Sequence, residues 1–418
     1  MNYLYRCFDC GVEHYADYIE KNLIYICPKC GLAERNKPLK GVLEVEYNYE
    51  LIKRKISSKK FLTSLAGDYR SYSVLLPIKS TVIKNSIKLN PTLQNIIFDN
   101  RQISVFNDTL NPTLSFKDRA SFLVCLKAIE LGITEISAAS TGNAGSSLAG
   151  ISAILGLKSK LFVPEKIPAP KRIQIQAYGA ELYVVKGTYD DAFDLCMSVS
   201  DKMKWYNRNT AFNPMTIEGK KSAAFDIFIL TKGNIPDSLF VPVGDGVIIA
   251  GLYKGFYDLH RVGLIEKIPK LIGVQSEGSN ALVRYLKNNK YEFIKTNTIA
   301  DSIDAAAPRN LYLATDVIKK TGGTAIAVKD DEIIEAQKML SRKYGILCEP
   351  SSASVFAAYI LMSVNDLDIY TNNAMLIVTG NGLKDFNSLT LWNKTPEIKT
   401  VAQWEKYFAE GNNAVNFT

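Results

Sequence analysis

Short apolar segments that predict buried strands alternate with predicted helices along most of this chain. Four of these segments are EISAAS, SLFVPVG, LIGVQS and AMLIVTG, and helical segments lie between them. Strands that alternate with helices favour a parallel sheet, because parallel strands need a long crossover that is usually a helix. We therefore predict an α/β fold in which ligands bind at the carboxyl ends of the strands.

The length and composition of the chain are those of a globular protein with more than one lobe. It has 418 residues, of which 47% are hydrophobic and 22% are charged, and these are ordinary values for globular domains. No apolar stretch is long enough to predict a membrane span. The N-terminus also lacks the apolar core of a signal peptide. We therefore expect a cytoplasmic protein that does not act at a membrane.

The charge and the histidine content exclude two classes of function. The net charge is +8, but the basic residues are scattered along the chain. Such scatter is more typical of a solvated surface than of a nucleic-acid-binding surface, so no nucleic-acid partner is expected. The two histidines, His14 and His260, are not near a G-x-S-x-G motif. Catalysis by a histidine-based triad is therefore not predicted.

The N-terminal segment is rich in cysteine and predicts a metal site. Four of the seven cysteines form two C-x2-C pairs, Cys7, Cys10, Cys27 and Cys30. Four thiolates at this spacing are typical of a structural Zn²⁺ site, and two disulfides are the alternative. His14 is a poorer candidate ligand. We predict a zinc-ribbon-like segment over residues 1–42 and a two-lobed domain over 43–418, with the smaller lobe at roughly 120–225.

Four further segments share one design, in which a turn of small or polar residues follows a predicted strand. They are Ser115–Arg119, Ser140–Ser146, Val243–Ile248 and Val378–Asp385. Such turns expose backbone N–H groups and hydroxyls at the mouth of a sheet, where a helix N-terminus favours an anion. Taken singly, each also has a plainer interpretation, as a surface lysine at a helix start, an N-cap or an ordinary turn.

Three of these segments each suit one kind of ligand chemistry. Lys117 opens a predicted helix, and a lysine there can form an imine with an aldehyde cofactor. The turn at Ser140–Ser146 suits a carboxylate, and the Gly-x-Gly turn at Val243–Ile248 suits a phosphate. The latter is neither G-x-G-x-x-G nor a Walker A loop, which argues against dinucleotide and ATP sites.

Together and in this order, the segments resemble the threonine synthase family of fold type II pyridoxal-phosphate enzymes. The matching pieces include NPTLSFKDRA, ASTGNAGSS, FNPMTIEGKKSAAFDI, VPVGDG, CEPSSASVFAA and VTGNGLKD. Some members of that family also carry an N-terminal zinc knuckle. The resemblance implies a tryptophan-synthase-β-like fold with two parallel-sheet α/β lobes and a small N-terminal zinc ribbon.

The resemblance also implies roles for individual residues. Lys117 would hold pyridoxal 5′-phosphate as a Schiff base and then move the protons of the substrate. Asn143 would hydrogen-bond the 3-oxygen of the cofactor, and Thr379 would face its ring nitrogen. The backbone that would cradle the cofactor phosphate belongs to Gly244, Asp245, Gly246, Val247 and Ile248. The residues that would hold the substrate carboxylate are Ser140, Thr141, Gly142, Asn143 and Ala144.

Three parts of the chain depart from the family pattern: Ala144, where members often carry a hydroxyl residue, and two positions that concern phosphate binding. Thr216 stands where members usually carry an arginine that binds the substrate phosphate, and a threonine cannot supply that charge. Lys220, Lys221 and Arg309 are candidates for a replacement. The cofactor loop contains Asp245, whose carboxylate would repel a phosphate. We therefore expect this side chain to turn away or to accept hydrogen bonds from the backbone.

The resemblance implies a lyase that converts O-phospho-L-homoserine and water into L-threonine and phosphate. A β-replacement or elimination enzyme of the same fold is the alternative, acting on phosphoserine, acetylserine or a related amino acid. It would be similar to cysteine synthase, cysteate synthase or a serine/threonine deaminase. A zinc-ribbon binding protein on a degenerate enzyme scaffold is a further possibility, against which Lys117, Asn143 and Thr379 argue. The expected partners are a small amino-acid substrate and a second copy of the chain in a homodimer.

Overall fold

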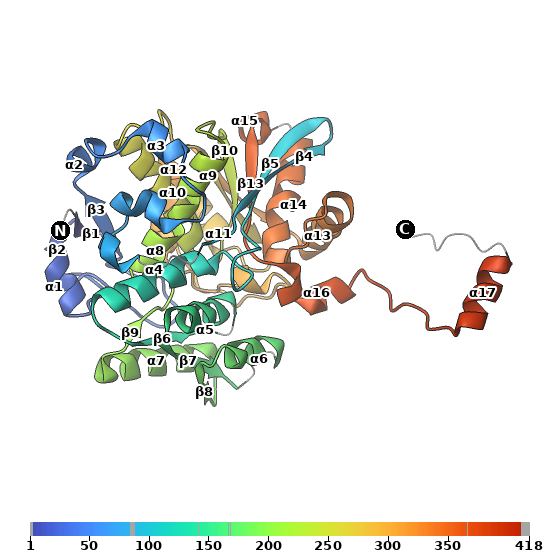
Figure 1. Cartoon of the computed structure of the whole chain (residues 1–418), viewed down its shortest axis with the longest axis horizontal. Helices are drawn as coiled ribbons and strands as arrows, with labels where there is room; N and C mark the ends of the chain where they lie inside the picture. Colours follow the sequence, from blue (N-terminus) through green and yellow to red (C-terminus); the bar gives the residue numbers. More distant parts are fainter. Residues whose placement is uncertain are drawn as a thin grey trace.

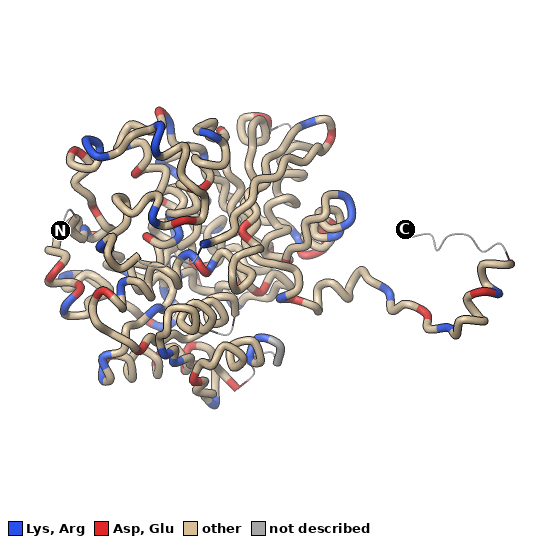
Figure 2. Tube along the Cα trace, in the orientation of Figure 1, with Lys and Arg blue, Asp and Glu red and all other residues tan. Residues whose placement is uncertain are grey.

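The strands of the described residues form three sheets, two of which belong to the α/β body (Figure 1). The structure is a computed structural model that describes residues 3–83, 88–140, 142–165, 167, 169–365 and 367–410. Among the helices of these residues, none is long and apolar enough to cross a membrane. Basic and acidic residues are interspersed over the body (Figure 2).

The larger sheet has six strands in the order β12-β11-β10-β13-β5-β4. Their bounds are β4 Thr92–Phe98, β5 Arg101–Asn107, β10 Ser238–Pro242, β11 Lys270–Ser276, β12 Thr324–Val328 and β13 Ala374–Val378. All neighbours are parallel except β4 and β5, which are antiparallel. The prediction of a parallel sheet is thus confirmed, with one antiparallel strand at its edge.

Both faces of the larger sheet are covered. Alternate residues of β10 enter different cores: Leu239 and Val241 belong to one, and Phe240 belongs to the other. The two cores lie on opposite faces because side chains alternate along a strand. Helices α10 (Val247–Arg261) and α12 (Leu311–Lys320) contribute to the first core. Helices α13 (Asp330–Tyr344) and α14 (Pro350–Val364) contribute to the second.

The smaller sheet has four parallel strands in the order β8-β7-β6-β9. They are β6 Glu135–Ala139, β7 Lys158–Pro164, β8 Glu181–Val185 and β9 Tyr206–Asn207. Helices α5 (Asn143–Leu155) and α7 (Tyr189–Met203) pack against β6 and β7, and α6 (Ala169–Ala177) packs against α5. These strands lie within residues 120–225, and the chain enters them after β5 and returns to the larger sheet at β10.

Three helices pack together at the centre of the body: α4 (Lys117–Glu130), α8 (Met215–Lys220) and α10. Their close approach depends on a glycine, because a Cβ at Gly219 would overlap with the backbone of Arg119. The Arg119 side chain is fully buried and pairs with Asp108 at 2.7 Å and with Asp226 at 2.6 Å. The arginine of the SFKDR segment therefore stabilises the junction of α4 with its neighbours.

The N-terminal sheet has the order β2-β1-β3. Its strands are β1 Tyr3–Cys7, β2 Glu13–Tyr15 and β3 Leu43–Tyr47. Strand β3 pairs with β1 along its whole length, from Tyr3 opposite Tyr47 to Cys7 opposite Leu43. This unit therefore continues to Tyr47, past the boundary predicted at residue 42. The cysteine pattern ends earlier because β3 carries no metal ligand.

The remaining elements complete the body and lead to the C-terminal segment. They are α1 Ala16–Lys21, α2 Tyr49–Lys53, α3 Ser58–Leu62, α9 Ser222–Leu230, α11 Ala281–Asn288, α15 Asp368–Thr371, α16 Phe386–Thr390 and α17 Val401–Ala409. The 3-10 helices of the described part of the chain are η1 Tyr69–Leu75, η2 Ser80–Val82, η3 Asp301–Ile303 and η4 Gly382–Lys384. Helix α17 has no buried residue and lies apart from the body (Figure 1).

Candidate active site

A cavity of about 470 Å³ lies where residues that follow β6, β10 and β13 come together. The carboxyl ends of strands from both sheets of the α/β body therefore meet at this cavity. Its lining includes these residues predicted for the site: Lys117, Ser140, Gly142, Asn143, Ala144, Gly244, Asp245, Gly246, Val247, Ile248 and Thr379. Thr141 lies outside the described residues.

Lys117 is the first residue of α4, and its side chain lines the cavity. The turn before it is docked on the turn after β13, where Phe116 N–H donates to the carbonyl of Thr379 at 2.7 Å. Burial lowers the pKa of Lys117, and nearby Arg208 adds to this effect, whereas Glu349 opposes it. A lysine with a lowered pKa is more often in the neutral, nucleophilic form that imine formation requires.

The turn after β6 begins helix α5. The Ser140 hydroxyl accepts hydrogen bonds from the N–H groups of Gly142 at 3.3 Å and Gly145 at 3.0 Å. The Asn143 amide donates to the Glu349 carboxylate at 2.9 Å, while its Oδ1 is buried without a partner among the described residues. A buried polar atom without a partner indicates that a ligand is to be bound there.

The Gly-x-Gly turn after β10 leads into helix α10. Gly246 has a φ of 84°, and no side chain caps the helix that begins at Val247. The first N–H groups of α10 are therefore available to an anion, which the helix dipole also favours. The Asp245 carboxylate accepts a hydrogen bond from the backbone N–H of Arg309 at 3.2 Å. This contact confirms the expectation that Asp245 would accept a backbone bond.

The turn after β13 is held by Ser352, one of the two serines that follow Glu349-Pro350 and that the family resemblance implies would shape the site. Ser352, on α14, accepts hydrogen bonds from the N–H groups of Thr379 at 3.0 Å and Gly380 at 2.9 Å. Its hydroxyl also lies 3.1 Å from that of Thr379. The segment CEPSSAS belongs to the family-like pieces, but no local signal distinguishes Ser352 from the serines beside it.

The donor set of this cavity fits pyridoxal 5′-phosphate. Lys117 offers an amine for the aldehyde, and the N-terminus of α10 offers N–H groups for the phosphate. Thr379 offers an uncharged hydroxyl group for the ring nitrogen. Asn143 offers a side-chain amide on the same cavity. Each of these groups reaches the cavity from a different element, so only the assembled fold brings them together.

Comparison with known proteins agrees with this geometry. The family model described as "Pyridoxal-phosphate dependent enzyme" matches residues 98–380. The chain is 36% identical to the threonine synthase of Methanocaldococcus jannaschii, over 91% of this chain and 93% of that protein. It is 32% identical to the threonine synthase of Methanosarcina acetivorans, over 92% of each chain.

The chain belongs to the threonine synthase family of pyridoxal-phosphate-dependent enzymes. Among solved structures, the serine racemase of Dictyostelium discoideum has a TM-score of 0.60 at 24% identity, covering 72% of this chain and 95% of that one. The cysteine synthase of Entamoeba histolytica has a TM-score of 0.61 at 20% identity, covering 78% and 97%. These structures establish fold type II, as the sequence predicts.

In this member of the threonine synthase family, Thr216 stands where relatives usually carry an arginine, and it does not contact the cavity in the arginine's place. The Thr216 hydroxyl donates to the carbonyl of Asn213 at 2.7 Å, and the residue does not line the cavity. Lys221 lies in a buried ion-pair cluster, with Glu218 at 2.5 Å and Asp258 at 2.8 Å. Neither residue therefore offers a free charge to a substrate.

Two of the candidate charges do line the cavity of this threonine synthase relative, Lys220 and Arg309. Arg309 is already engaged, because its guanidinium donates to the carbonyl of Glu34 at 3.0 Å and lies 3.6 Å from Asp190. Lys220 has no hydrogen bond or ion pair within the part of the chain that the structure describes. Of these candidate charges, Lys220 is thus the one whose ammonium group has no partner among the described residues.

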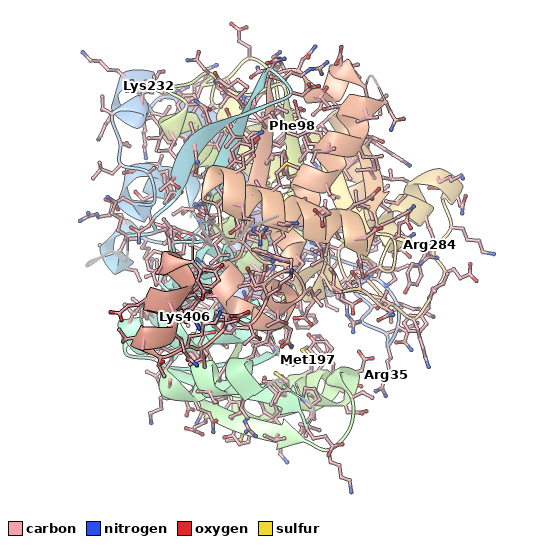
Figure 3. All side chains as sticks on the ribbon, turned by 90° about the vertical axis from the view of Figure 1, so that its right-hand side faces the viewer. Arg35, Phe98, Met197, Lys232, Arg284 and Lys406 are labelled. Carbon is pink, nitrogen blue, oxygen red and sulfur yellow. The ribbon has the colours of Figure 1, made fainter. Side chains whose placement is uncertain are left out.

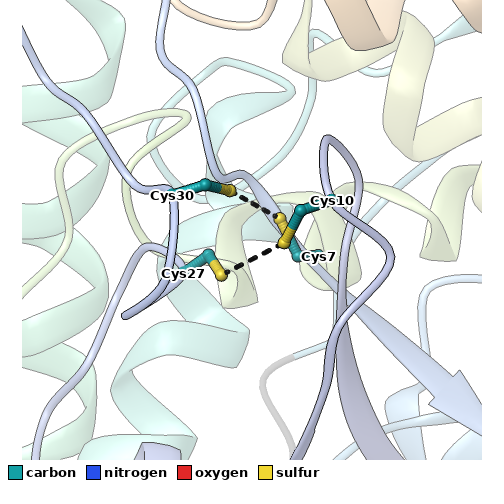
Figure 4. A group of neighbouring side chains, drawn as sticks. All are labelled: Cys7, Cys10, Cys27 and Cys30. Carbon is teal, nitrogen blue, oxygen red and sulfur yellow. Dashed lines mark hydrogen bonds between the residues drawn. The ribbon is translucent and has the colours of Figure 1, made fainter.

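The four N-terminal cysteines come together as predicted (Figure 4). Their sulfurs all lie within 4.8 Å of one another, with Cys7 and Cys30 at 3.4 Å and Cys10 and Cys27 at 3.8 Å. All four are free thiols, so the structure does not contain the two disulfides of the alternative interpretation. Such a cluster fits the tetrahedral arrangement of thiolates around Zn²⁺. The Nε2 atom of His14 lies 3.5 Å from the Cys27 sulfur, outside this set.

The loop that follows the second cysteine pair, residues 32–39, reaches the rim of the cavity. Asn36 lines the cavity, and its carbonyl accepts a hydrogen bond from the Tyr291 hydroxyl at 2.8 Å. Arg35 donates to Asp191 at 2.8 Å, at the start of α7, and lies beside the smaller lobe in Figure 3. This loop therefore contacts both lobes, which no local sequence signal predicted.

Proposed function

We propose that the protein is a pyridoxal-phosphate-dependent lyase that converts O-phospho-L-homoserine and water into L-threonine and phosphate. The observation that carries this proposal is the position of Lys117, at the start of α4 and in one cavity with the Gly244–Ile248 turn and the start of α5. The names of the relatives in Methanocaldococcus jannaschii and Methanosarcina acetivorans support the choice of reaction.

Each part of the cavity would hold one part of the cofactor. Lys117 would bind its aldehyde carbon covalently, and the backbone of Gly244–Ile248 would bind its phosphate at the N-terminus of α10. The Asn143 side chain would hydrogen-bond its 3-oxygen, and the Thr379 hydroxyl would face its ring nitrogen. The bound cofactor supplies an electron sink for the pair left behind when a substrate carbon loses a proton.

The substrate would bind by its carboxylate at the start of α5. The N–H groups there, together with the Ser140 hydroxyl, favour an anion, and Gly142, Asn143 and Ala144 line the cavity at this point. Once the substrate amine has displaced Lys117, the freed amine of Lys117 would remove the α-proton and then a β-proton. Phosphate would leave from the γ-carbon, which would then gain a proton to become the methyl group. Water would add its oxygen to the β-carbon, and the α-carbon would regain a proton from Lys117.

The covalent assignment is tested by fixing the cofactor in place. Reduction of the holoenzyme with borohydride, followed by peptide mass spectrometry, is expected to find the cofactor on Lys117. Lys117→Ala is expected to lose this label and its activity while keeping its melting transition. A label on Lys220, which lines the same cavity, would overturn the assignment.

The reaction is tested by incubating the holoenzyme separately with O-phosphohomoserine, O-phosphoserine, O-acetylserine and threonine. Threonine and phosphate in equal amounts are expected from the first compound. Lys343→Gln is a matched control, since it removes an exposed lysine on α13. Turnover of O-phosphoserine or O-acetylserine without phosphate release from O-phosphohomoserine would instead favour a β-replacement enzyme. Turnover of threonine alone would favour a deaminase.

We further propose that Cys7, Cys10, Cys27 and Cys30 bind one structural Zn²⁺. The mutual approach of their sulfurs supports a four-thiolate site, which leaves no open position for a substrate. Elemental analysis of protein purified under reducing conditions is expected to give about one zinc per chain. Cys30→Ser is expected to lower this value, and zinc-free wild-type protein would contradict the proposal.

A further inference from the structure

Lys220 combines deep burial with the absence of a protein partner. Its exposed fraction is 1%, it lines the cavity, and none of the ion pairs or hydrogen bonds of the described residues involves its ammonium group. Lysines are seldom buried without a partner, because an unpaired charge is costly to remove from water. Such a group is therefore expected to have a partner that is absent from the protein itself.

The backbone holds Lys220 in this position. Helix α8 packs against α10 so closely that a Cβ at Gly251 would lie 2.7 Å from Cβ of Lys220. Lys220 lies four residues after Thr216, which is about one helical turn along the same face of α8. The helix therefore presents a cation one turn beyond the position where the family usually carries its arginine.

A second buried cation lies beside the cavity. Arg208 is 1% exposed, and its Nη1 donates to the hydroxyl of Thr210, a cavity residue, at 2.6 Å. Its Nε donates to Ser121 at 3.2 Å, while its Nη2 is buried without a partner among the described residues. No carboxylate of these residues forms an ion pair with Arg208. Both of its engaged partners are neutral hydroxyls, so its charge is not balanced by the protein.

These cations influence one another through the low-dielectric interior. Burial lowers the pKa of Lys220 well below its ordinary value, and Lys117 and Arg208 lower it further. Among the described acidic groups, Asp245 opposes this shift, but its carboxylate is already engaged by the backbone of Arg309. The lowered pKa disfavours the cationic form of Lys220 in the protein alone, and a multiply charged anion bound beside Lys220 and Arg208 would favour that form.

We propose that Lys220, assisted by Arg208 behind Thr210, binds a phosphate monoester dianion in this cavity. Two phosphates share this chemistry, that of the cofactor and that of the leaving group, and the inference rests on the proposed function for the second of them. A Lys–phosphate contact in a dry site is a charge-assisted hydrogen bond. Its loss is expected to weaken phosphate binding by about ten- to a hundredfold.

The first measurement uses Lys220→Gln, with Lys343→Gln as the matched surface control. Because glutamine has no ionisable group whose burial costs free energy, the ligand-free variant is expected to melt at the same temperature as wild type or higher. Inorganic phosphate is expected to raise the melting temperature of wild-type holoenzyme and of the control, but not of Lys220→Gln. A purely structural role for Lys220 would instead lower the melting temperature of the ligand-free variant, and this result would overturn the proposal.

The second measurement distinguishes the two sources of phosphate. The apoenzyme is titrated with pyridoxal phosphate and, in parallel, with pyridoxal, which lacks the phosphate. If Lys220→Gln weakens the binding of pyridoxal phosphate but not of pyridoxal, the phosphate that Lys220 binds is that of the cofactor. If the Lys220→Gln holoenzyme is no longer stabilised by inorganic phosphate but its affinity for the cofactor is unchanged, the phosphate that Lys220 binds is that of the leaving group. Lys220→Arg is expected to restore most of the lost affinity in either case.

If Lys220→Gln changes neither response, the inference is wrong. These binding measurements do not depend on turnover. A holoenzyme that binds phosphate through Lys220 but fails to convert O-phosphohomoserine would therefore contradict the proposed function and leave this inference intact.

Discussion

Glu44 shows how a single partly buried side chain makes stability depend on pH. It lies on β3, between residues that are fully buried, and no ion pair of the described residues includes it. Burial raises the pKa of Glu44 to about 7, while Lys254 and Lys320 oppose the shift. A glutamate in an unfolded chain has a pKa of about 4.3. The folded protein therefore binds more protons than the unfolded chain between these two pH values, and its stability falls as the pH rises through them.

Glu44→Gln is expected to remove this dependence, because the amide has no charge to bury. The free energy of unfolding should rise by about 1–2 kcal/mol at pH 8, and the gain should shrink as the pH is lowered to 5.5. Urea unfolding of wild type and variant at several pH values measures both quantities. A gain that is equal at pH 5.5 and pH 8 would show that ionisation of Glu44 is not its cause.

At the scale of elements, helix α8 depends on glycine for its place between α4 and α10. A Cβ at Gly219 would overlap with the carbonyl of Arg119, and one at Gly255 would overlap with the carbonyl of Lys221. Backbone atoms cannot move aside as a flexible side chain can, so the helices would have to separate. Any separation would also shift Lys220, the next residue after Gly219.

Gly219→Ala is therefore expected to destabilise the protein by about 1–3 kcal/mol through overpacking. This loss exceeds the gain of about 1 kcal/mol that alanine brings to an exposed helix position. Thermal unfolding measures the change, and phosphate binding by the folded variant reports the displacement of Lys220. A variant more stable than wild type would contradict the close packing of α8 on α4.

Much of this arrangement could be predicted from local sequence patterns. The parallel strands and the turns that carry Lys117, Asn143 and Thr379 each lie within one continuous segment, so hydrophobic patterning and turn residues predict them. The role of Arg119 could not be predicted, because its partners Asp108 and Asp226 are far apart along the chain. Asn36 lines the cavity only because the N-terminal unit docks against the body, which is a tertiary contact without a local pattern.

At the scale of the whole molecule, the N-terminal unit joins the two lobes at the cavity rim. The loop 32–39 contacts the smaller lobe through Arg35 and the larger lobe through Asn36, whose carbonyl is bound by Tyr291. The cysteine cluster immediately precedes this loop, so a bound metal would fix the point from which the loop starts. The position of the rim therefore depends on a cluster outside the cavity.

Removal of the metal is expected to raise the KM for the amino-acid substrate while the cofactor absorbance is retained. Arg35→Gln is expected to raise the KM about two- to fivefold without loss of metal, since it breaks an exposed ion pair. Steady-state kinetics before and after chelation, with zinc added back as the control, measure the effect. Chelated protein with an unchanged KM would indicate that the loop is held by its contacts with the lobes alone.

The strand order of the larger sheet has a consequence for how the protein is made. Strand β13 lies between β10 and β5, although β5 precedes it by more than half of the chain. While the ribosome is still translating, the β4–β5 hairpin has an open edge that only Ala374–Val378 can close. The four strands of the smaller sheet are complete long before that point. The nascent chain is therefore expected to fold its smaller lobe first, and any product that stops before residue 374 retains an unpaired, aggregation-prone edge.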